Sequence, residues 1–200
     1  MKFKDYQPLL NSRRPPKVSV CIPTYRGGST LGAAIESVLS QSLTDFELIV
    51  IDDASPDDTR AIVERYADPR IIYLRNGTNL GPQSNWNRCL AVARGRYFKL
   101  LPHDDRLKPQ SLQRQADILD ADDEETIALV FSARDVIDTH GQVITRRGYP
   151  SADEGLIPAD TLIRACVRRG TNLLGEPGAV LFRKSLASQI GLFDATHPYF

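Results

Sequence analysis

The chain of 200 residues has no apolar run long enough to cross a bilayer, and its first residues contain no apolar core of a signal peptide. It also lacks an excess of charge, because 25 Lys and Arg residues balance 25 Asp and Glu residues. A chain without net charge has no overall field that attracts nucleic acid. We therefore expect a soluble cytoplasmic protein that does not bind nucleic acid. The sequence leaves open whether the protein associates peripherally with the inner face of a membrane.

Cysteine is scarce, and the three that occur form no metal-binding pattern. Cys21, Cys89 and Cys166 are widely scattered and lack the spacing of metal ligands. Each lies in an apolar strand or helix pattern, so we expect buried, reduced thiols. Internal repeats, low-complexity tracts, a Walker loop and a GxGxxG fingerprint are absent as well. The most familiar nucleotide-binding signatures are therefore excluded.

Strand and helix patterns alternate from Lys17 onward. Apolar, β-rich runs predict four strands, at 18–22, 47–51, 71–74 and 97–101. Apolar residues at helical spacing predict helices around 31–39, 56–66, 82–93 and 112–119, the second capped by Ser55 and the third ended by a left-handed Gly95. This alternation predicts an α/β fold of the Rossmann-like kind, with a mainly parallel sheet flanked by helices.

The two ends of the chain depart from this pattern. Residues 1–16 are polar and end in a proline pair, which predicts a tail or linker. After Asp120 the pattern predicts a small antiparallel part, with a strand at 127–136, a return strand at 143–145, a helix that packs through Leu162, Ile163, Cys166 and Val167, a strand at 179–182 and a short helix at 184–191. We expect residues 17–200 to form one domain that is truncated at its C-terminus.

Two acidic pairs each follow a predicted buried strand. Asp52 and Asp53 come after the strand at 47–51, and Asp104 and Asp105 follow the strand at 97–101. Parallel strands end at the same edge of a sheet, where open α/β folds bind ligands, so we expect the four carboxylates to lie near one another. They would repel each other unless a divalent cation, a basic ligand or hydroxyl groups lay between them. The pattern predicts a metal-assisted site for a nucleotide-linked substrate.

Each of these residues also has a simpler interpretation. One of Asp52 and Asp53 can bond the turn or cap the next helix, while the other holds a base or a ribose. Asp104 and Asp105 can form an ordinary surface turn. His103 can be a metal ligand or a structural residue, and the sequence leaves both open.

Several short segments, taken in order, carry a family resemblance. They are 18–25 (VSVCIPTY), 34–42 (AIESVLSQS), 46–55 (FELIVIDDAS), 79–81 (NLG), 93–95 (ARG) and 101–105 (LPHDD). In this order they resemble the inverting glycosyltransferases of family 2, which have the GT-A fold. The resemblance implies transfer of a sugar from a nucleotide-diphosphate sugar, with UDP favoured, to an acceptor hydroxyl. It also implies inversion and a Mg²⁺ or Mn²⁺ cofactor.

The resemblance implies roles for single residues in nucleotide binding. Pro23, Thr24 and Tyr25 would line the nucleotide pocket, with Tyr25 near the base. Asp53 would hold the uracil edge or the ribose, and Asp52 would be its neighbour.

The metal site and the general base are implied in the same way. Asp104 and Asp105 match the DXD-type motif of the family, Asp105 as a direct metal ligand and Asp104 as a contact for both metal and nucleotide. His103 stands where a fuller motif has another acid. In the family a carboxylate after a stretch like 191–194 deprotonates the acceptor. We expect that base beyond Phe200, with Glu176 as a substitute candidate.

The implied acceptor is a carbohydrate or a lipid-linked sugar, in polysaccharide or cell-envelope assembly. Three other functions stay open. A nucleotidyltransferase shares the sheet and the metal, although residues 26–28 match its Gly-rich signature only thinly. A phosphate-accepting receiver domain would need a further Asp at the end of the strand at 71–74, which residues 71–76 do not supply. A non-catalytic module that binds a nucleotide sugar would need no base.

Overall fold

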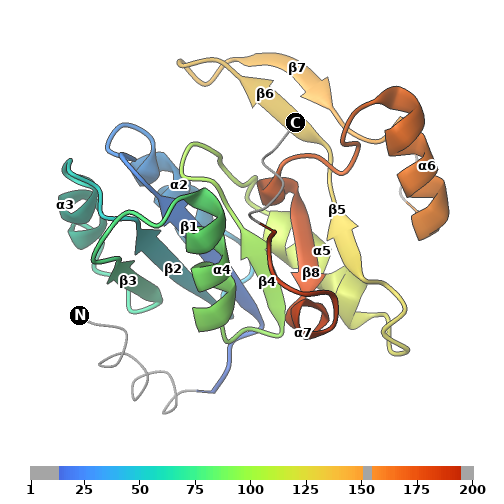
Figure 1. The fold of residues 1–200 in the computed structure, drawn as a ribbon, viewed down its shortest axis with the longest axis horizontal. Coiled ribbons are helices and arrows are strands. Elements are labelled where there is room, and N and C mark those ends of the chain that lie inside the picture. The colour runs from blue at the N-terminus through green and yellow to red at the C-terminus, as the bar shows by residue number, and fades with distance from the viewer. Residues whose placement is uncertain (1–13, 151–154, 195–200) are drawn as a thin grey trace.

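The computed structural model describes residues 14–150 and 155–194 (Figure 1). Its central sheet has the strand order β3-β2-β1-β4-β8-β5. Four strands in this row are parallel, namely β3 (Ile71–Arg75), β2 (Phe46–Asp52), β1 (Val18–Thr24) and β4 (Tyr97–Leu100). β8 (Val180–Arg183) runs antiparallel to β4, and β5 (Leu129–Phe131) pairs with β8. The predicted α/β class with a mainly parallel sheet is confirmed.

Side chains of the central strands alternate between two cores, one on each face of the sheet. Val20 and Leu48 belong to the core covered by α2 (Leu31–Leu39), α3 (Thr59–Glu64) and α5 (Ser111–Asp120). Cys21 and Ile49 belong to the opposite core, which α4 (Pro82–Val92) covers. Because β1 and β2 are buried on both faces, their sequences are mostly apolar rather than alternating.

A smaller part follows α5. β6 (Arg134–Ile137) and β7 (Val143–Arg147) form the expected antiparallel hairpin, and α6 (Ala159–Arg169) comes next. The short helices η1 (Pro177–Ala179), η2 (Lys184–Leu186) and α7 (Ala187–Ile190) flank β8. Within 14–150 and 155–194, no helix has both the length and the apolar character needed to span a membrane.

The expectation of one continuous strand at 127–136 is wrong. The chain forms β5 and then β6, which belong to different sheets. β5 pairs with β8, whereas β6 pairs with β7. Ser132 lies between the two strands and donates its N–H to Ala179 O (3.2 Å). The pairing partners therefore divide a segment that local propensity predicts to be continuous.

The expected packing face of α6 is only half correct. Leu162 and Cys166 are half-buried, but Ile163 and Val167 are 62% and 74% exposed. Cys166 is therefore not the fully buried thiol that its pattern predicts, whereas Cys21 and Cys89 are buried, and all three thiols are free.

Two local expectations around β1 are also wrong. Pro23 does not end the strand, which continues to Thr24. Beyond Cys21 the strand pairs with β2 alone, and this leaves room for a residue without an N–H. Gly95 has no positive φ and forms no left-handed cap. Glycine is needed there because a Cβ would lie 2.4 Å from the backbone N of Ser19.

Candidate functional site

The carboxyl ends of β2, β1 and β4 form one edge of the sheet, with β1 in the middle. Asp53 donates its backbone N–H to Thr24 O at the end of β1 (2.8 Å), and Leu101 donates to Cys21 O (2.8 Å). Adjacent strands lie about 4.8 Å apart, so the ends of β2 and β4 are separated by about 10 Å. The acidic pairs at 52–53 and 104–105 therefore leave the same edge, on either side of β1.

Asp52 is buried and builds a turn. Its Oδ1 accepts the N–H of Ser55 (2.8 Å), and its Oδ2 accepts the hydroxyl of Tyr73 (2.7 Å). The expected cap at Ser55 does not form, because Oγ of Ser55 accepts the N–H of Arg26 (3.0 Å), and α3 begins at Thr59 instead of at residue 56. Nη1 of Arg75 lies 3.5 Å from the same carboxylate. Asp52 thus holds its own chain, as the simpler interpretation has it for one member of the pair.

Asp53 is also buried, and it organises the loop between β3 and α4. Its Oδ1 accepts Nδ2 of Asn76 (2.5 Å) and the N–H of Leu80 (2.9 Å), and its Oδ2 accepts the N–H of Gly81 (2.9 Å). Three donors on one carboxylate fix the loop. Asp53 therefore shapes this edge of the sheet by holding residues 76–81 against it.

Two buried polar atoms at this edge have no hydrogen-bond partner among the described residues, namely Oγ1 of Thr24 and Oδ1 of Asn76. A buried polar atom without a partner costs about 1–3 kcal/mol, so each one calls for an explanation. Oδ1 of Asn76 lies next to Asp53, because Nδ2 of the same amide donates to its carboxylate, whereas Oγ1 of Thr24 lies beside the turn at Gly27, 2.3 Å from the position of a Cβ there. Asn76 is not among the predicted site residues, although its position directly after β3 marks it.

Tyr25 stands at the rim of the same edge. Its side chain is 40% exposed, and the guanidinium of Arg26 lies 5.2 Å from the centre of its ring. The backbone of Arg26 has a φ of 56° and donates its N–H to Oγ of Ser55 (3.0 Å). An exposed aromatic ring held beside a cation can stack on a flat ligand. Pro23 lies just before this turn, in the buried part of β1.

Asp105 lies in a crowded acidic environment, whereas Asp104 is exposed. Burial, together with the charges of Asp104 and Glu176, raises the pKa of Asp105 to about 6, while Arg134 and His103 oppose this rise. Glu176 is 3.5 Å from Nη2 of Arg134, which comes from β6. Arg134 at the start of β6 and Glu176 before η1 therefore both lie near the 104–105 pair. The sequence pattern does not predict this position for Arg134.

The donor set at 104–105 fits a divalent cation that arrives with a diphosphate. In the described part of the chain, no group of three or more His, Cys, Asp or Glu side chains could hold a metal by itself. Mg²⁺, however, is often bound through one or two carboxylates plus substrate phosphates. The repulsion that Asp104 and Glu176 exert on Asp105 is the repulsion that a cation relieves. The ring of His103 packs near Gly27, with Cδ2 3.5 Å from the position of a Cβ there, so its contact is with a turn.

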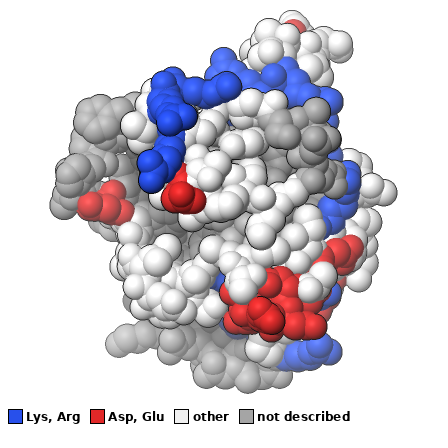
Figure 2. Space-filling model, turned by 90° about the vertical axis from the view of Figure 1, so that its right-hand side faces the viewer, with Lys and Arg blue, Asp and Glu red and all other residues white. Residues whose placement is uncertain are grey.

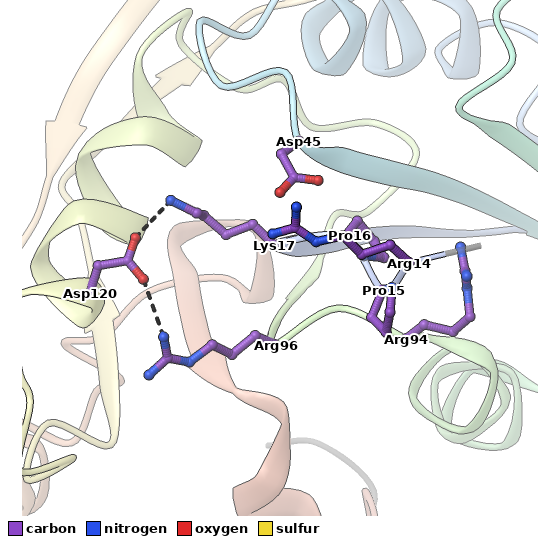
Figure 3. Close-up of a pocket in the computed structure, with 8 residues that line it drawn as sticks. All are labelled: Arg14, Pro15, Pro16, Lys17, Asp45, Arg94, Arg96 and Asp120. Atoms are coloured by element: carbon purple, nitrogen blue, oxygen red, sulfur yellow. Dashed lines mark hydrogen bonds and ion pairs between the residues drawn. The ribbon is translucent and has the colours of Figure 1, made fainter.

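A pocket of about 320 Å³ lies at the opposite edge of the sheet, where β1, β2 and β4 begin (Figure 3). It is lined by Arg14, Pro15, Pro16, Lys17, Asp45, Arg94, Arg96 and Asp120. Lys17 and Arg96 both contact Asp120 (2.8 and 3.6 Å), and Arg94 pairs with Glu47 (2.7 Å). These charges largely neutralise one another. The pocket is therefore separate from the acidic edge and offers no comparable set of groups.

The sequence matches the family model of Glycosyl transferase family 2 over residues 19–191. The uncharacterized protein MT1568 of Mycobacterium tuberculosis is 36% identical over 188 residues, covering 89% of this chain and 57% of that protein. The uncharacterized glycosyltransferase RP339 of Rickettsia prowazekii is 32% identical over 205 residues, covering 100% of this chain and 58% of that protein. The chain therefore spans less than two thirds of the length of these relatives.

A shorter match names an acceptor. WfaP of Escherichia coli, a UDP-Glc:alpha-D-GlcNAc-diphosphoundecaprenol beta-1,3-glucosyltransferase, is 40% identical over 88 residues, which are 44% of this chain and 35% of that protein.

Two solved structures share the fold. TarS 1-349 of S. aureus in complex with UDP superimposes with a TM-score of 0.67 at 22% identity, covering 86% of this chain and 48% of that one. The mannosyltransferase PcManGT from Pyrobaculum calidifontis, in complex with GDP-Man and Mn²⁺, gives a TM-score of 0.62 at 20% identity over 90% of this chain and 48% of that one. On the family match and these superpositions, the chain belongs to glycosyltransferase family 2 and has the GT-A fold.

Proposed function

We propose that this chain binds a nucleotide-diphosphate sugar at the carboxyl edge of β2, β1 and β4, and that the enzyme transfers the sugar to an acceptor hydroxyl. The observation that carries the proposal is that one edge of the sheet holds two unpartnered buried polar atoms, Oγ1 of Thr24 and Oδ1 of Asn76, together with the acidic pair at 104–105, where like charges crowd Asp105. The first set suits a nucleoside and the second a metal-bound diphosphate. TarS in complex with UDP and with UDP-GlcNAc, and PcManGT with GDP-Man and Mn²⁺, support both halves.

In this proposal the nucleoside lies between Tyr25 and the loop at 76–81. Tyr25 and Pro23 supply apolar surface for the base, and Oγ1 of Thr24 and Oδ1 of Asn76 supply hydrogen bonds. Asp53 acts mainly by holding the loop, because its oxygens already accept three donors. Asp52 supports the turn beside it. UDP is the preferred nucleotide, and GDP is the competing one.

The diphosphate half of the site belongs to the second acidic pair. Asp105, with Asp104 beside it, would hold Mg²⁺ or Mn²⁺, and the bound cation would neutralise charge on the departing nucleoside diphosphate. Asp104, being exposed, is free to reach phosphate through the cation. Asp105 must be ionised for this role, and its raised pKa shows that it loses its proton less readily than an isolated Asp.

Inversion would require a general base on the acceptor side. Glu176 lies near the 104–105 pair, close enough to raise the pKa of Asp105, and its side chain is 62% exposed. Arg134 holds it, however, so Glu176 stays the second choice for the base, after the carboxylate expected beyond Phe200.

The proposed acceptor is a carbohydrate or a lipid-linked sugar, and the name of WfaP supports the lipid-linked class. A peripheral contact with the inner face of a membrane would bring such an acceptor to the site. Figure 2 shows Lys and Arg side chains gathered in a band on the side of the molecule that carries α6. On α6 itself Arg164, Arg168 and Arg169 are exposed, which suits anionic headgroups.

The test is a thermal-shift titration with UDP and with GDP, each with and without Mn²⁺. We expect saturable stabilisation by UDP that Mn²⁺ strengthens, since a ligand that binds only the folded state raises its stability. No shift with either nucleotide would refute the proposal. Product analysis with UDP-sugars then separates the alternatives. Release of UDP supports sugar transfer, release of pyrophosphate indicates a nucleotidyltransferase, and binding without turnover indicates a binding module.

A further inference from the structure

Lys99 is a buried lysine in the middle of β4. Its side chain is 1% exposed, and its Nζ donates to Oε1 of Gln115 on α5 (2.8 Å) and to the backbone O of Val180 at the start of β8 (3.2 Å). No carboxylate pairs with it among the residues that the structure describes. Burial alone lowers its pKa to about 7. A buried amine without a counter-charge is unfavourable for folding, so its presence needs a reason other than stability.

Lys99 and Gln115 together hold one short backbone segment, the residues from Glu176 to Val180. Lys99 binds the carbonyl of Val180, and Nε2 of Gln115 binds the carbonyl of Ala179 (2.8 Å). Ala179 in turn donates its N–H to Glu176 O (2.8 Å), which closes the turn of η1. The two side chains thus anchor one end of the segment from inside the core.

The same segment lies directly behind Asp105. A Cβ on Gly178 would lie 3.2 Å from Oδ2 of Asp105 and 3.2 Å from Cδ1 of Leu101. The segment also carries Glu176, whose charge helps to raise the pKa of Asp105. A displacement of this segment would therefore move the backbone that packs against Asp105.

We propose that Lys99 and Gln115 are positioning residues, which hold the segment 176–180 against Asp105 and so set the geometry of the metal-diphosphate site. The inference deepens the proposed function and rests on it. A methionine would fill the same space as Lys99 without burying an amine, but it has no donor for the carbonyl of Val180. The lysine thus costs folding stability and orders the site.

The experiment compares Lys99→Met and Gln115→Leu with a control, Tyr97→Phe. Tyr97 is buried on the same face of β4 as Lys99, but its hydroxyl donates to Asp120 (2.7 Å), at the end of the strand away from Asp105. Hydrogen–deuterium exchange is followed in peptides that cover 172–183 and, for comparison, β1 and β2. The Mn²⁺ concentration for half-maximal thermal stabilisation in saturating UDP is then measured for each protein.

We expect both variants to exchange faster in 172–183 but not in β1 or β2, and to need about 10- to 100-fold more Mn²⁺, as is typical when supports of a metal ligand are removed. Tyr97→Phe should match the wild type in both measurements. Because the two residues hold one segment, the double variant should need little more Mn²⁺ than either single variant.

Two results would overturn the inference. One is unchanged exchange in 172–183 for Lys99→Met and Gln115→Leu, which needs no ligand to observe. The other is a wild type that responds to UDP and Mn²⁺ while both variants respond at the same Mn²⁺ concentration. A wild type that binds no nucleotide would instead refute the proposed function, and faster exchange in 172–183 would still show that Lys99 and Gln115 hold the segment.

Discussion

Burial of Lys99 lowers the free energy of unfolding, and the size of this penalty should depend on pH. The pKa of Lys99 is about 7 in the folded protein and 10.5 when exposed. Between these values the unfolded chain binds the proton and the folded chain does not, so the free energy of unfolding rises with pH across this window. Each pKa unit is worth about 1.4 kcal/mol, which gives an upper limit of about 5 kcal/mol for the full penalty. The penalty is complete below pH 7 and disappears as the pH approaches 10.5.

The substitution Lys99→Met removes this penalty at every pH. It also leaves the carbonyl of Val180 and Oε1 of Gln115 without a donor, at a cost of about 1–3 kcal/mol that does not vary with pH. We therefore expect the variant to be more stable than the wild type at pH 6–7, and its advantage to shrink by about 1 kcal/mol per pH unit between pH 7 and pH 10.

The measurement is urea unfolding of both proteins at pH 6, 7, 8, 9 and 10, with the difference in unfolding free energy plotted against pH. Tyr97→Phe serves as the control, since its difference from the wild type should stay level between pH 7 and pH 9. A level line for Lys99→Met over the same range would show that Lys99 titrates as an exposed lysine does, and the reasoning about its burial would be wrong.

Three further predictions concern the site itself. Asp105→Asn should abolish the effect of Mn²⁺ on stabilisation by UDP without lowering the stability of the free protein. In the wild type the effect of Mn²⁺ should fade below about pH 6, because protonation of Asp105 competes with metal binding. Thermal shifts measured over a series of pH values check this. Asp53→Ala should lower the free energy of unfolding by about 3 kcal/mol in urea, since it removes the hydrogen bonds by which Asn76, Leu80 and Gly81 hold the 76–81 loop. The exposed Asp123→Ala should cost less than about 0.5 kcal/mol. Gly178→Ala should press on Asp105 and weaken Mn²⁺ binding in the presence of UDP about tenfold, while Gly77→Ala, where a Cβ meets nothing within 4 Å, should not. A Gly178→Ala protein with normal Mn²⁺ binding would show that the segment yields freely.

Three strands of the parallel sheet, β1, β2 and β4, could be predicted because each is buried on both faces and is therefore a mainly apolar run. The division of 127–136 could not, because it depends on pairing with β8, which lies far along the chain. The helix start after β2 was predicted too early because Oγ of Ser55 accepts the N–H of Arg26 and so does not cap a helix at residue 56.

The candidate site was predictable in part for the same reason. The edge that carries the acidic pairs follows from strand order, which the alternation of strands and helices indicates. The partners of Asp53, the unpaired oxygen of Asn76 and the approach of Arg134 to Glu176 depend on loop geometry and on contacts between distant segments. In the sequence Lys99 is a single charged residue within an apolar strand pattern. Only the structure shows that its side chain is buried.

The reversed direction of β8 has a consequence for how such a chain can vary. Because β8 runs against β4, the polypeptide enters β8 at the very edge where it left β4, so the segment before β8 returns to the acidic rim. The hairpin and α6 lie between β5 and β8, two strands of the central sheet, and so form an excursion whose two ends are fixed by that sheet. That excursion can lengthen, shorten or change its surface to suit a different acceptor, while the donor side of the same sheet keeps its shape.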